Sequence, residues 1–173
     1  QVFESYGFAE LQTPTLEYAE VLTGKYGEEA EKLMYLFKDK GNREVGLKYD
    51  LTVPLARVMA QYPDLPKPFK RYQIQPVFRA ENTQKGRYRE IYQCDIDTVG
   101  TASQIADAEI ITIISTSLNA LGLTNFTIRI NSRKILFGIT QSTSILQTLD
   151  KLDKKTEGEV KQELASKGLS SDQ

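Results

Sequence analysis

Charged and polar side chains alternate in two short segments of the chain that are joined by a basic loop. Arg79 and Glu81 lie two residues apart in the first segment. Gln93, Asp95 and Asp97 repeat at the same spacing in the second. Because successive side chains of a strand point to opposite faces, each set shares one face of a predicted hairpin. Such groups could bind the phosphates and the amine of a substrate, although an ordinary amphipathic hairpin with a solvated face has the same pattern.

The loop between the two segments is cationic. Lys85, Arg87 and Arg89 surround Gly86. A flexible loop with this charge could close over a polyphosphate and open again to release the product. We therefore expect it to act as a flap over a phosphate-containing ligand.

The second segment also has an apolar phase, made of Tyr92, Cys94 and Ile96. This phase is typical of a strand face that packs on a core. Cys94 is the only cysteine, so the chain cannot form an internal disulfide. We expect Cys94 to be a small buried hydrophobic residue rather than a reactive thiol.

The composition indicates a soluble intracellular protein and excludes several kinds of chemistry. The 173 residues are 40% hydrophobic and 26% charged, with no apolar run long enough to cross a membrane. The net charge of −1 provides no overall basic field, so any RNA contact must come from a local patch or from parts outside this chain. Histidine is absent, which excludes Ser-His and Cys-His nucleophiles and imidazole metal sites. The mechanisms that remain are positioning of the substrates and electrostatic stabilisation of the transition state.

The elements that must position the hairpin precede it. Because the chain begins inside an apparent helix, we expect it to be part of a longer polypeptide. Alternating apolar residues predict a second hairpin. In chain order the expected elements are a helix at 1–6, a strand that ends at Pro14, helix and loop at 18–31, a strand at 33–37, a turn at 38–42 and a strand at 45–49.

Asp50 lies where the strand at 45–49 meets the start of a predicted helix. A carboxylate at such a junction can meet an ammonium group while the two elements hold it still. Thr52 occupies the expected position of the helix cap, with Pro54 in the first turn and Leu55 on the apolar stripe. For Thr52, simple capping and a substrate contact both remain open.

Further elements follow the hairpin. Asp107 and Glu109 begin a predicted helix, where acidic residues interact favourably with the helix dipole. The expected elements are a helix at 106–121 closed by Gly122, a strand at 126–130, a helix capped by Ser132 that runs through Phe137, and a helix that begins at a Thr156–Glu159 capping box and ends near Gly168.

Three separated segments carry a resemblance to a known family. Phe78-Arg79-Ala80-Glu81, with the loop and strand that follow, resembles motif 2 of the class II aminoacyl-tRNA synthetases. Gly86-Arg87-Tyr88-Arg89-Glu90 and Tyr92-Gln93-Cys94-Asp95 are similar to histidyl-tRNA synthetases in particular. Residues 47–57 resemble the histidine-binding segment of the eukaryotic and archaeal branch of that family, and residues 23–28 match the same branch.

The resemblance extends over residues 6–168 and implies an α+β fold. This is a class II synthetase-like antiparallel β-sheet flanked by helices, of which the chain holds a part. Residues 1–148 would form the partial catalytic core, which includes the second half of motif 1. Residues 149–173 would begin an inserted helical domain.

The activity that the resemblance implies is histidine–tRNA ligation. The complete protein would activate histidine with ATP, accompanied by Mg²⁺, to histidyl-adenylate and transfer the histidyl group to tRNA(His). It would be a cytoplasmic homodimer. The chain ends before the second histidine-specific motif and before motif 3, so we expect the 173 residues alone to be inactive.

The resemblance also assigns roles to residues of this chain. Arg79 would be the catalytic residue, contacting the α-phosphate of ATP and the carboxylate of histidine. The ATP-binding set would be Arg79, Glu81 at the adenine amino group, Arg87 at the outer phosphates, and Ile91 against adenine, where the family usually has an aromatic residue. The histidine-binding set would be Asp50, Leu51, Thr52, Arg79, Gln93 and Asp97.

Within the histidine-binding set, Asp50, Thr52 and Gln93 would bind the α-ammonium group, and Asp97 would accept a hydrogen bond from the imidazole. Two non-aminoacylating relatives remain as alternatives: the regulatory subunit of ATP phosphoribosyltransferase and the synthetase-like, tRNA-sensing domain of a stress kinase. The presence of the whole set argues against both.

Overall fold

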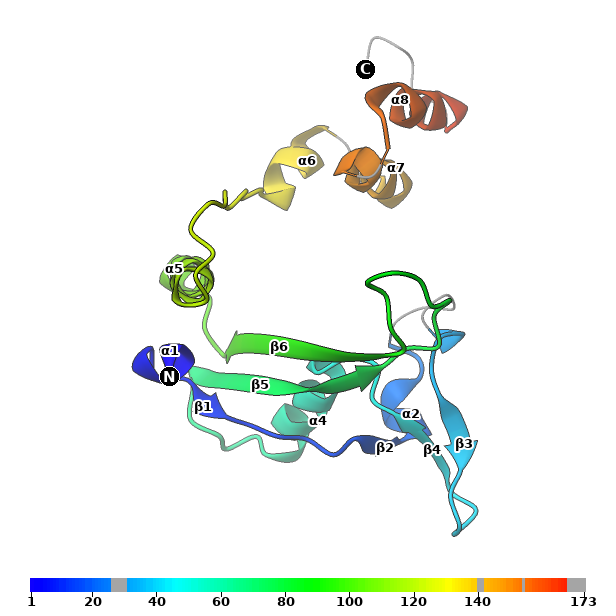
Figure 1. Cartoon of the computed structure of the whole chain (residues 1–173), viewed down its shortest axis with the longest axis vertical. Coiled ribbons are helices and arrows are strands. Elements are labelled where there is room, and N and C mark those ends of the chain that lie inside the picture. The colour runs from blue at the N-terminus through cyan, green and yellow to red at the C-terminus, as the bar shows by residue number, and fades with distance from the viewer. Residues whose placement is uncertain (26–30, 140–141, 154, 168–173) are drawn as a thin grey trace. The chain divides into compact units, whose positions relative to one another are not determined.

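The computed structural model describes residues 1–25, 31–139, 142–153 and 155–167. Contacts divide the chain into two compact units, Gln1–Phe126 and Thr127–Gln173. The first unit contains two three-stranded sheets, and the second is built from short helices (Figure 1). Among the described residues, no helix has the length and apolar character needed to cross a membrane. The α+β class expected from the sequence is confirmed.

A long antiparallel hairpin dominates the first sheet. Strands β5 (Phe69–Phe78) and β6 (Glu90–Val99) pair without interruption from Phe69 opposite Val99 to Phe78 opposite Glu90. Strand β1 (Ala9–Glu10) adds in parallel on the other side of β5, giving the order β1-β5-β6. The predicted second strand of the hairpin is therefore confirmed, and the first strand lies earlier than expected.

The second sheet has the order β2-β4-β3, with both pairs antiparallel. It consists of β2 (Leu16–Tyr18), β3 (Leu36–Lys38) and β4 (Glu44–Leu47). The hairpin predicted from alternating residues is present, but its first strand begins at Leu36 rather than at Leu33. Of the predicted helix and loop at 18–31, the structure describes α2 (Ala19–Leu22); residues 26–30 lie outside the described residues.

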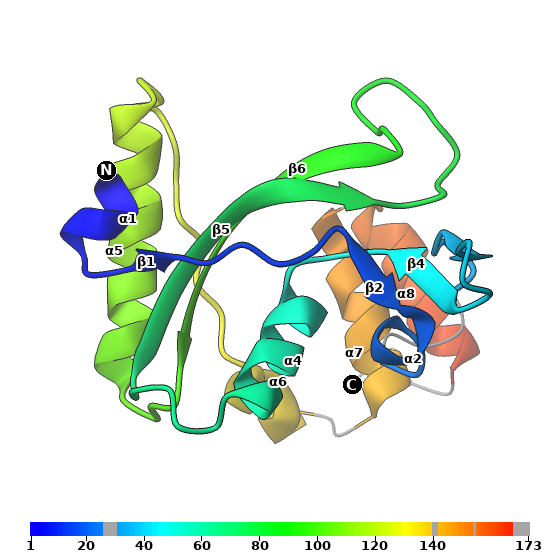
Figure 2. The ribbon, with the colours of Figure 1, turned by 90° about the horizontal axis from the view of Figure 1, so that it is seen from below.

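Helices α1 (Val2–Ser5) and α5 (Gln104–Ala120) lie together at one end of the β5–β6 hairpin (Figure 2). Lys70 of β5 joins them: its Nζ donates to the Tyr6 carbonyl at 2.6 Å and to Glu109 Oε1 at 2.8 Å. The predicted helix at 106–121 is confirmed, and Gly122 follows it with φ +81°. Glu109, interpreted from sequence only through the helix dipole, also forms this tertiary ion pair.

Helix α4 (Thr52–Gln61) lies beneath β5 in Figure 1. Pro54 and Leu55 are buried, as the predicted apolar stripe requires. Of the two roles left open for Thr52, capping is not found, because Thr52 is the first helical residue and Leu51 precedes it as the cap. The carboxylate of Asp50 instead accepts a hydrogen bond from the Val53 N–H at 3.0 Å. This N–H lies in the first turn of the helix, where backbone amides have no carbonyl partner within the helix.

The predicted strand at 126–130 is wrong. These residues carry no strand assignment and belong to neither sheet, although their apolar residues alternate. Alternation shows which side chains would share a face, but a strand also needs a partner for its backbone hydrogen bonds.

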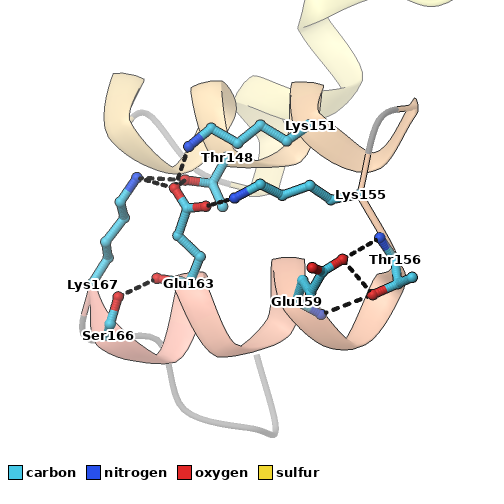
Figure 3. A network of polar contacts seen from close by, with 8 residues as sticks. All are labelled: Thr148, Lys151, Lys155, Thr156, Glu159, Glu163, Ser166 and Lys167. Carbon is cyan, nitrogen blue, oxygen red and sulfur yellow. Dashed lines mark hydrogen bonds and ion pairs between the residues drawn. The ribbon is translucent and has the colours of Figure 1, made fainter.

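The second unit contains α6 (Arg133–Ile139), α7 (Thr143–Leu149), a 3₁₀ turn at Asp150–Asp153 and α8 (Glu157–Ser166). The predicted capping box is confirmed: Thr156 and Glu159 exchange side-chain and backbone hydrogen bonds (Figure 3). Contacts group α6 and α7 with α8, whereas the sequence analysis placed residues 127–148 in the catalytic core. The assignment of residues 149–173 to an inserted domain stays a prediction.

One carboxylate links α8 to the preceding turn in this unit. Glu163 accepts from Lys151, Lys155 and Lys167, and Lys167 also reaches Thr148 (Figure 3). These lysines lower the pKa of Glu163 to about 2. The carboxylate therefore stays ionised across the physiological range and holds the two segments together.

Close packing at Gly46 of β4 provides a test of the second sheet. A Cβ at Gly46 would lie 2.7 Å from Leu36 Cδ2, 2.8 Å from the Tyr35 carbonyl oxygen and 2.9 Å from Leu22 Cδ1. Because backbone is among these neighbours, we expect Gly46→Ala to lower the free energy of unfolding by about 1–3 kcal/mol in thermal or urea denaturation. Gly41→Ala is the control, since only flexible side-chain ends approach that position; equal stability of both variants would contradict the packing.

Candidate active site

One face of the β5–β6 hairpin carries polar and charged side chains from both strands. The register places Arg71 opposite Asp97, and Gln75 opposite Gln93. Between and beyond these pairs lie Gln73 opposite Asp95 and Val77 opposite Ile91. The predicted common face of Gln93, Asp95 and Asp97 is therefore confirmed, and it includes Ile91 of the same strand and an arginine and two glutamines of β5.

The prediction that Phe78–Glu81 forms a strand is wrong beyond Phe78, where β5 ends. The Arg79 N–H still donates to the Arg89 carbonyl at 2.9 Å, but the Ala80 N–H turns to the Leu33 carbonyl at 2.8 Å. This bond draws the chain away from β6. Arg79 and Glu81 therefore lie in the mouth of the loop rather than within the sheet.

The Arg79 side chain is fixed against two neighbouring segments. Its Nε donates to the Tyr49 carbonyl at 3.2 Å, and its Nη2 donates to Gln93 Oε1 at 3.4 Å. The guanidinium carbon lies 4.6 Å from the centroid of the Tyr49 ring, a cation–π contact. The structure thus brings Arg79 and Gln93 together, as expected, and the side chain is oriented before any ligand binds.

Glu81 and Arg87 form an ion pair across the loop. The Glu81 side chain is 15% exposed and that of Arg87 is 55% exposed. Glu81 therefore lies on the protein side of the pair, and Arg87 lies on the solvent side. Gly86, at the tip beside Arg87, has φ +79°, a conformation that favours glycine. An ATP that used both side chains would have to separate them.

The segment before α4 lies beside this face. Leu51 is fully buried, and its carbonyl accepts from Arg71 Nη2 at 3.2 Å. Asp50 is half-buried and Thr52 is exposed. The field of Asp50 acts on both Arg71 and Asp95, which places its carboxylate near the hairpin face.

Asp97 forms an ion pair with Arg71. Their Oδ2 and Nη2 atoms are 2.6 Å apart, and the Asp97 side chain is 32% exposed while Arg71 is fully buried. Oδ2 is buried against the Arg71 guanidinium. A ligand would therefore bind Asp97 through its other carboxylate oxygen, Oδ1, which can accept a hydrogen bond.

A buried polar network, which was not predicted from the sequence, supports this face. Gln75 Oε1 accepts from Lys48 Nζ at 2.6 Å and from Gln73 Nε2 at 2.5 Å. Gln73 Nε2 also donates to Thr13 Oγ1 at 2.9 Å, and Gln73 Oε1 accepts from Arg71 Nη1 at 2.9 Å. The signal for it was present: Arg71, Gln73 and Gln75 alternate along the strand as the residues of β6 do.

Three carboxylates approach one another on this face. Burial raises the pKa of Asp95, Asp97 and Asp50 raise it further, and Arg71 and Arg79 oppose the change. Burial lowers the pKa of the Arg71 guanidinium, while Asp97, Asp95 and Asp50 counteract this effect. The face thus combines anions and cations that partly compensate one another.

The prediction that Tyr92 and Cys94 face a core is wrong in this structure. Tyr92 is 71% exposed, and Cys94 is exposed as well. The same opposite face carries Ile74, which is 49% exposed. Alternation identified the residues that share this face correctly, but it could not show whether another element covers them.

Two hollows among the described residues lie near the hairpin and the second sheet, and neither encloses the predicted site. The larger, of about 680 Å³, lies between α4 and the second sheet and is lined by none of the predicted site residues. The smaller, of about 290 Å³, borders Asp97 and the start of α5. Arg79 and Gln93 line neither of these two hollows.

Comparison with known proteins assigns the chain to a family. The family model described as histidyl-tRNA synthetase matches residues 1–173. The chain belongs to the histidyl-tRNA synthetase family. A curated relative, the histidine–tRNA ligase of Rhodopirellula baltica, is 51% identical over 162 residues, which cover 89% of this chain and 37% of the relative. The chain thus spans well under half the length of this histidyl-tRNA synthetase relative.

Solved structures of the histidyl-tRNA synthetase family agree with the fold. The crystal structure of histidyl-tRNA synthetase from Nostoc sp. PCC 7120 matches 99% of this chain and 40% of its own, with a TM-score of 0.82 and 37% identity. A structure from Bacillus halodurans, titled as an ATP phosphoribosyltransferase regulatory subunit/histidyl-tRNA synthetase, matches 68% of this chain and 30% of its own, with a TM-score of 0.59 and 25% identity.

Because the pKa of Asp95 is raised, the stability of this histidyl-tRNA synthetase family member should depend on the ionisation of Asp95. A carboxylate whose pKa is raised on folding destabilises the folded state when ionised, and this cost fades as pH falls through the raised pKa. We expect Asp95→Asn to raise the melting temperature at pH 7 and to lose this advantage near pH 4, about the ordinary pKa of Asp. Melting curves against pH measure this.

The control for this experiment is Asp64→Asn, at an exposed position in the loop between α4 and β5. A melting temperature at pH 7 that is unchanged or lower in Asp95→Asn would show that the ionised Asp95 stabilises the fold, contrary to this account.

Proposed function

We propose that this chain is the part of a histidine–tRNA ligase that holds the motif 2 half of the active site. The complete protein activates histidine with ATP and transfers it to tRNA(His) as a cytoplasmic homodimer, with Mg²⁺ entering on the phosphates of ATP. The observation that carries the proposal is Arg79, which is oriented by Tyr49 and Gln93 at the edge of a face that also holds Asp97.

The proposed reaction needs no protein nucleophile. A carboxylate oxygen of histidine attacks the α-phosphorus of ATP, the bond to the bridging oxygen of pyrophosphate breaks, and histidyl-adenylate and pyrophosphate form. Negative charge grows on the α-phosphate oxygens during this displacement. Arg79 stabilises that charge and aligns the carboxylate of histidine, because its side chain is already held in place.

ATP binding involves the loop and the strand beside it. Glu81 accepts from the adenine amino group, Arg87 binds the outer phosphates, and Ile91 packs on adenine. Glu81 and Arg87 are paired with each other in the free protein, so ATP binding exchanges this ion pair for two contacts with the nucleotide. Separating this partly exposed ion pair costs little free energy, because salt bridges at the surface contribute about 0–1 kcal/mol.

Histidine binding uses the other end of the face. Asp50, Thr52 and Gln93 bind the α-ammonium group together with the backbone around Leu51. Asp97 accepts a hydrogen bond from the imidazole. Support for this role comes from the Asp97 side chain, which is 32% exposed, is held by Arg71 and lies on the same face as Gln93.

Regulation of an ATP phosphoribosyltransferase is the second candidate, because the B. halodurans structure carries both names. The similarity to the Nostoc synthetase is greater in identity and in TM-score, and it extends over almost the whole chain. These differences favour the ligase.

Histidine-dependent exchange of pyrophosphate into ATP by the longer protein tests the proposal. We expect exchange with histidine alone among the amino acids, and a loss of about 10²–10³-fold in the rate constant for Arg79→Ala, the scale for one electrostatic donor. Lys40→Ala, at an exposed turn position, is the control. A folded, unsubstituted protein without exchange would favour the regulatory relative, and full activity of Arg79→Ala would remove Arg79 from the reaction.

The role of Asp97 has its own test. We expect Asp97→Asn to lower kcat/KM for histidine by about 10–100-fold, because asparagine keeps an acceptor oxygen but loses the charge, and a hydrogen bond to a charged group contributes about 1.5–3 kcal/mol. KM for ATP should change little. Asparagine keeps the volume beside Arg71, and Asp64→Asn serves as the control. An unchanged kcat/KM for histidine would contradict the assignment.

A further inference from the structure

Arg71 is the most deeply buried charged side chain on the hairpin face. Its exposed fraction is 0%. Its guanidinium contacts three elements: Nη2 meets Asp97 of β6 at 2.6 Å and the Leu51 carbonyl before α4 at 3.2 Å, and Nη1 donates to Gln73 within β5 at 2.9 Å. One side chain therefore joins the two places to which the proposed function assigns the ends of histidine.

Burial of the Arg71 guanidinium costs free energy of desolvation, so the need to fill a core position does not explain why an arginine is found here. Removing a guanidinium from water costs several kcal/mol, and an apolar residue could fill such a place as stably. Three carboxylates, those of Asp97, Asp95 and Asp50, offset the cost through their charge. They share a small region with Arg71 and would repel one another without it. The positive charge of Arg71 therefore compensates the negative charges of these three carboxylates.

The geometry of the guanidinium adds a positional constraint. Its planar fork presents several N–H groups in fixed directions, so contacts with Asp97 and with the Leu51 carbonyl constrain each other. Leu51 is the cap residue of α4, directly between Asp50 and Thr52. A shift of Arg71 would change the distance between Asp97 and this segment.

We propose that Arg71 is a positioning residue for histidine recognition, which holds Asp97 and the Asp50–Thr52 segment at the separation that histidine requires. The inference rests on the proposed function of the same face. Arg71 does not touch the substrate, because its side chain is fully buried. It acts through Asp97 and the Leu51 carbonyl, whereas Arg79, at the opposite end of the face, serves the phosphate.

A positioning role predicts a selective change in kinetics. In pyrophosphate exchange by the longer protein, we expect Arg71→Met to raise KM for histidine on the order of 100-fold, the effect of misplacing a binding group by about 1 Å. KM for ATP should stay within about threefold of the unsubstituted value, because ATP does not use Asp97. Arg71→Lys keeps the charge but not the fork, and should recover part of the loss.

Lys70→Met is the matched control. Lys70 is the neighbouring cation on β5, faces the opposite side and forms an ion pair with Glu109. Its loss should affect stability without changing KM for histidine. Melting curves of every variant separate a folding defect from a binding defect. If Arg71→Met does not fold, Arg71→Lys decides, and an unchanged KM for histidine in that variant overturns the proposal.

A double-mutant cycle with Asp97→Asn tests the route of the effect. If Arg71 acts through Asp97, Arg71→Met raises KM for histidine much less in the Asp97→Asn background than in the unsubstituted protein. Effects that multiply, or equal increases in KM for histidine and ATP, would overturn the positioning role. Absence of histidine-dependent exchange by the unsubstituted protein would instead overturn the proposed function, and this inference with it.

Discussion

The uninterrupted pairing of β5 with β6 is the constraint on which the site depends. It fixes Arg71 opposite Asp97 and Gln75 opposite Gln93, so the order of functional groups along the face follows from one register. A slip of one residue would turn every one of these side chains to the opposite face. The buried contacts of Gln73 and Gln75 with Thr13 and Lys48 fix which face of β5 turns inward, and the Arg71–Asp97 ion pair favours this register with β6.

The face separates two tasks along its length. Arg79, at the mouth of the loop, is held by Tyr49 and Gln93, where phosphate chemistry is proposed. Asp97, at the other end, is held by the buried Arg71, where side-chain recognition is proposed. Arg79 and Asp97 are fixed by contacts with neighbouring segments, while Glu81 and Arg87, for which ATP binding is proposed, lie on a loop. Under the proposed function, the contacts with histidine are therefore held by fixed side chains, and only the contacts of ATP with Glu81 and Arg87 involve a loop.

Sequence patterns correctly predicted the features that depend only on residues close together in the chain. Alternation identified the face of β6, and the Thr156–Glu159 pattern identified a capping box, because both depend on neighbours in sequence. Arg71 and Lys48 were missed because burial of a cation depends on partners from distant segments. The exposure of Cys94 and the lone extended segment at 126–130 were misjudged for the same reason, since covering elements and partner strands are tertiary facts.

The most direct test of the account is a crystal structure of the longer protein with histidine bound. We expect an imidazole nitrogen within hydrogen-bonding distance of the Asp97 carboxylate, the α-ammonium group beside Asp50 and Gln93, and the carboxylate of histidine facing Arg79. Histidine bound elsewhere, or with its imidazole away from Asp97, would contradict the central claim that this hairpin face selects the amino acid.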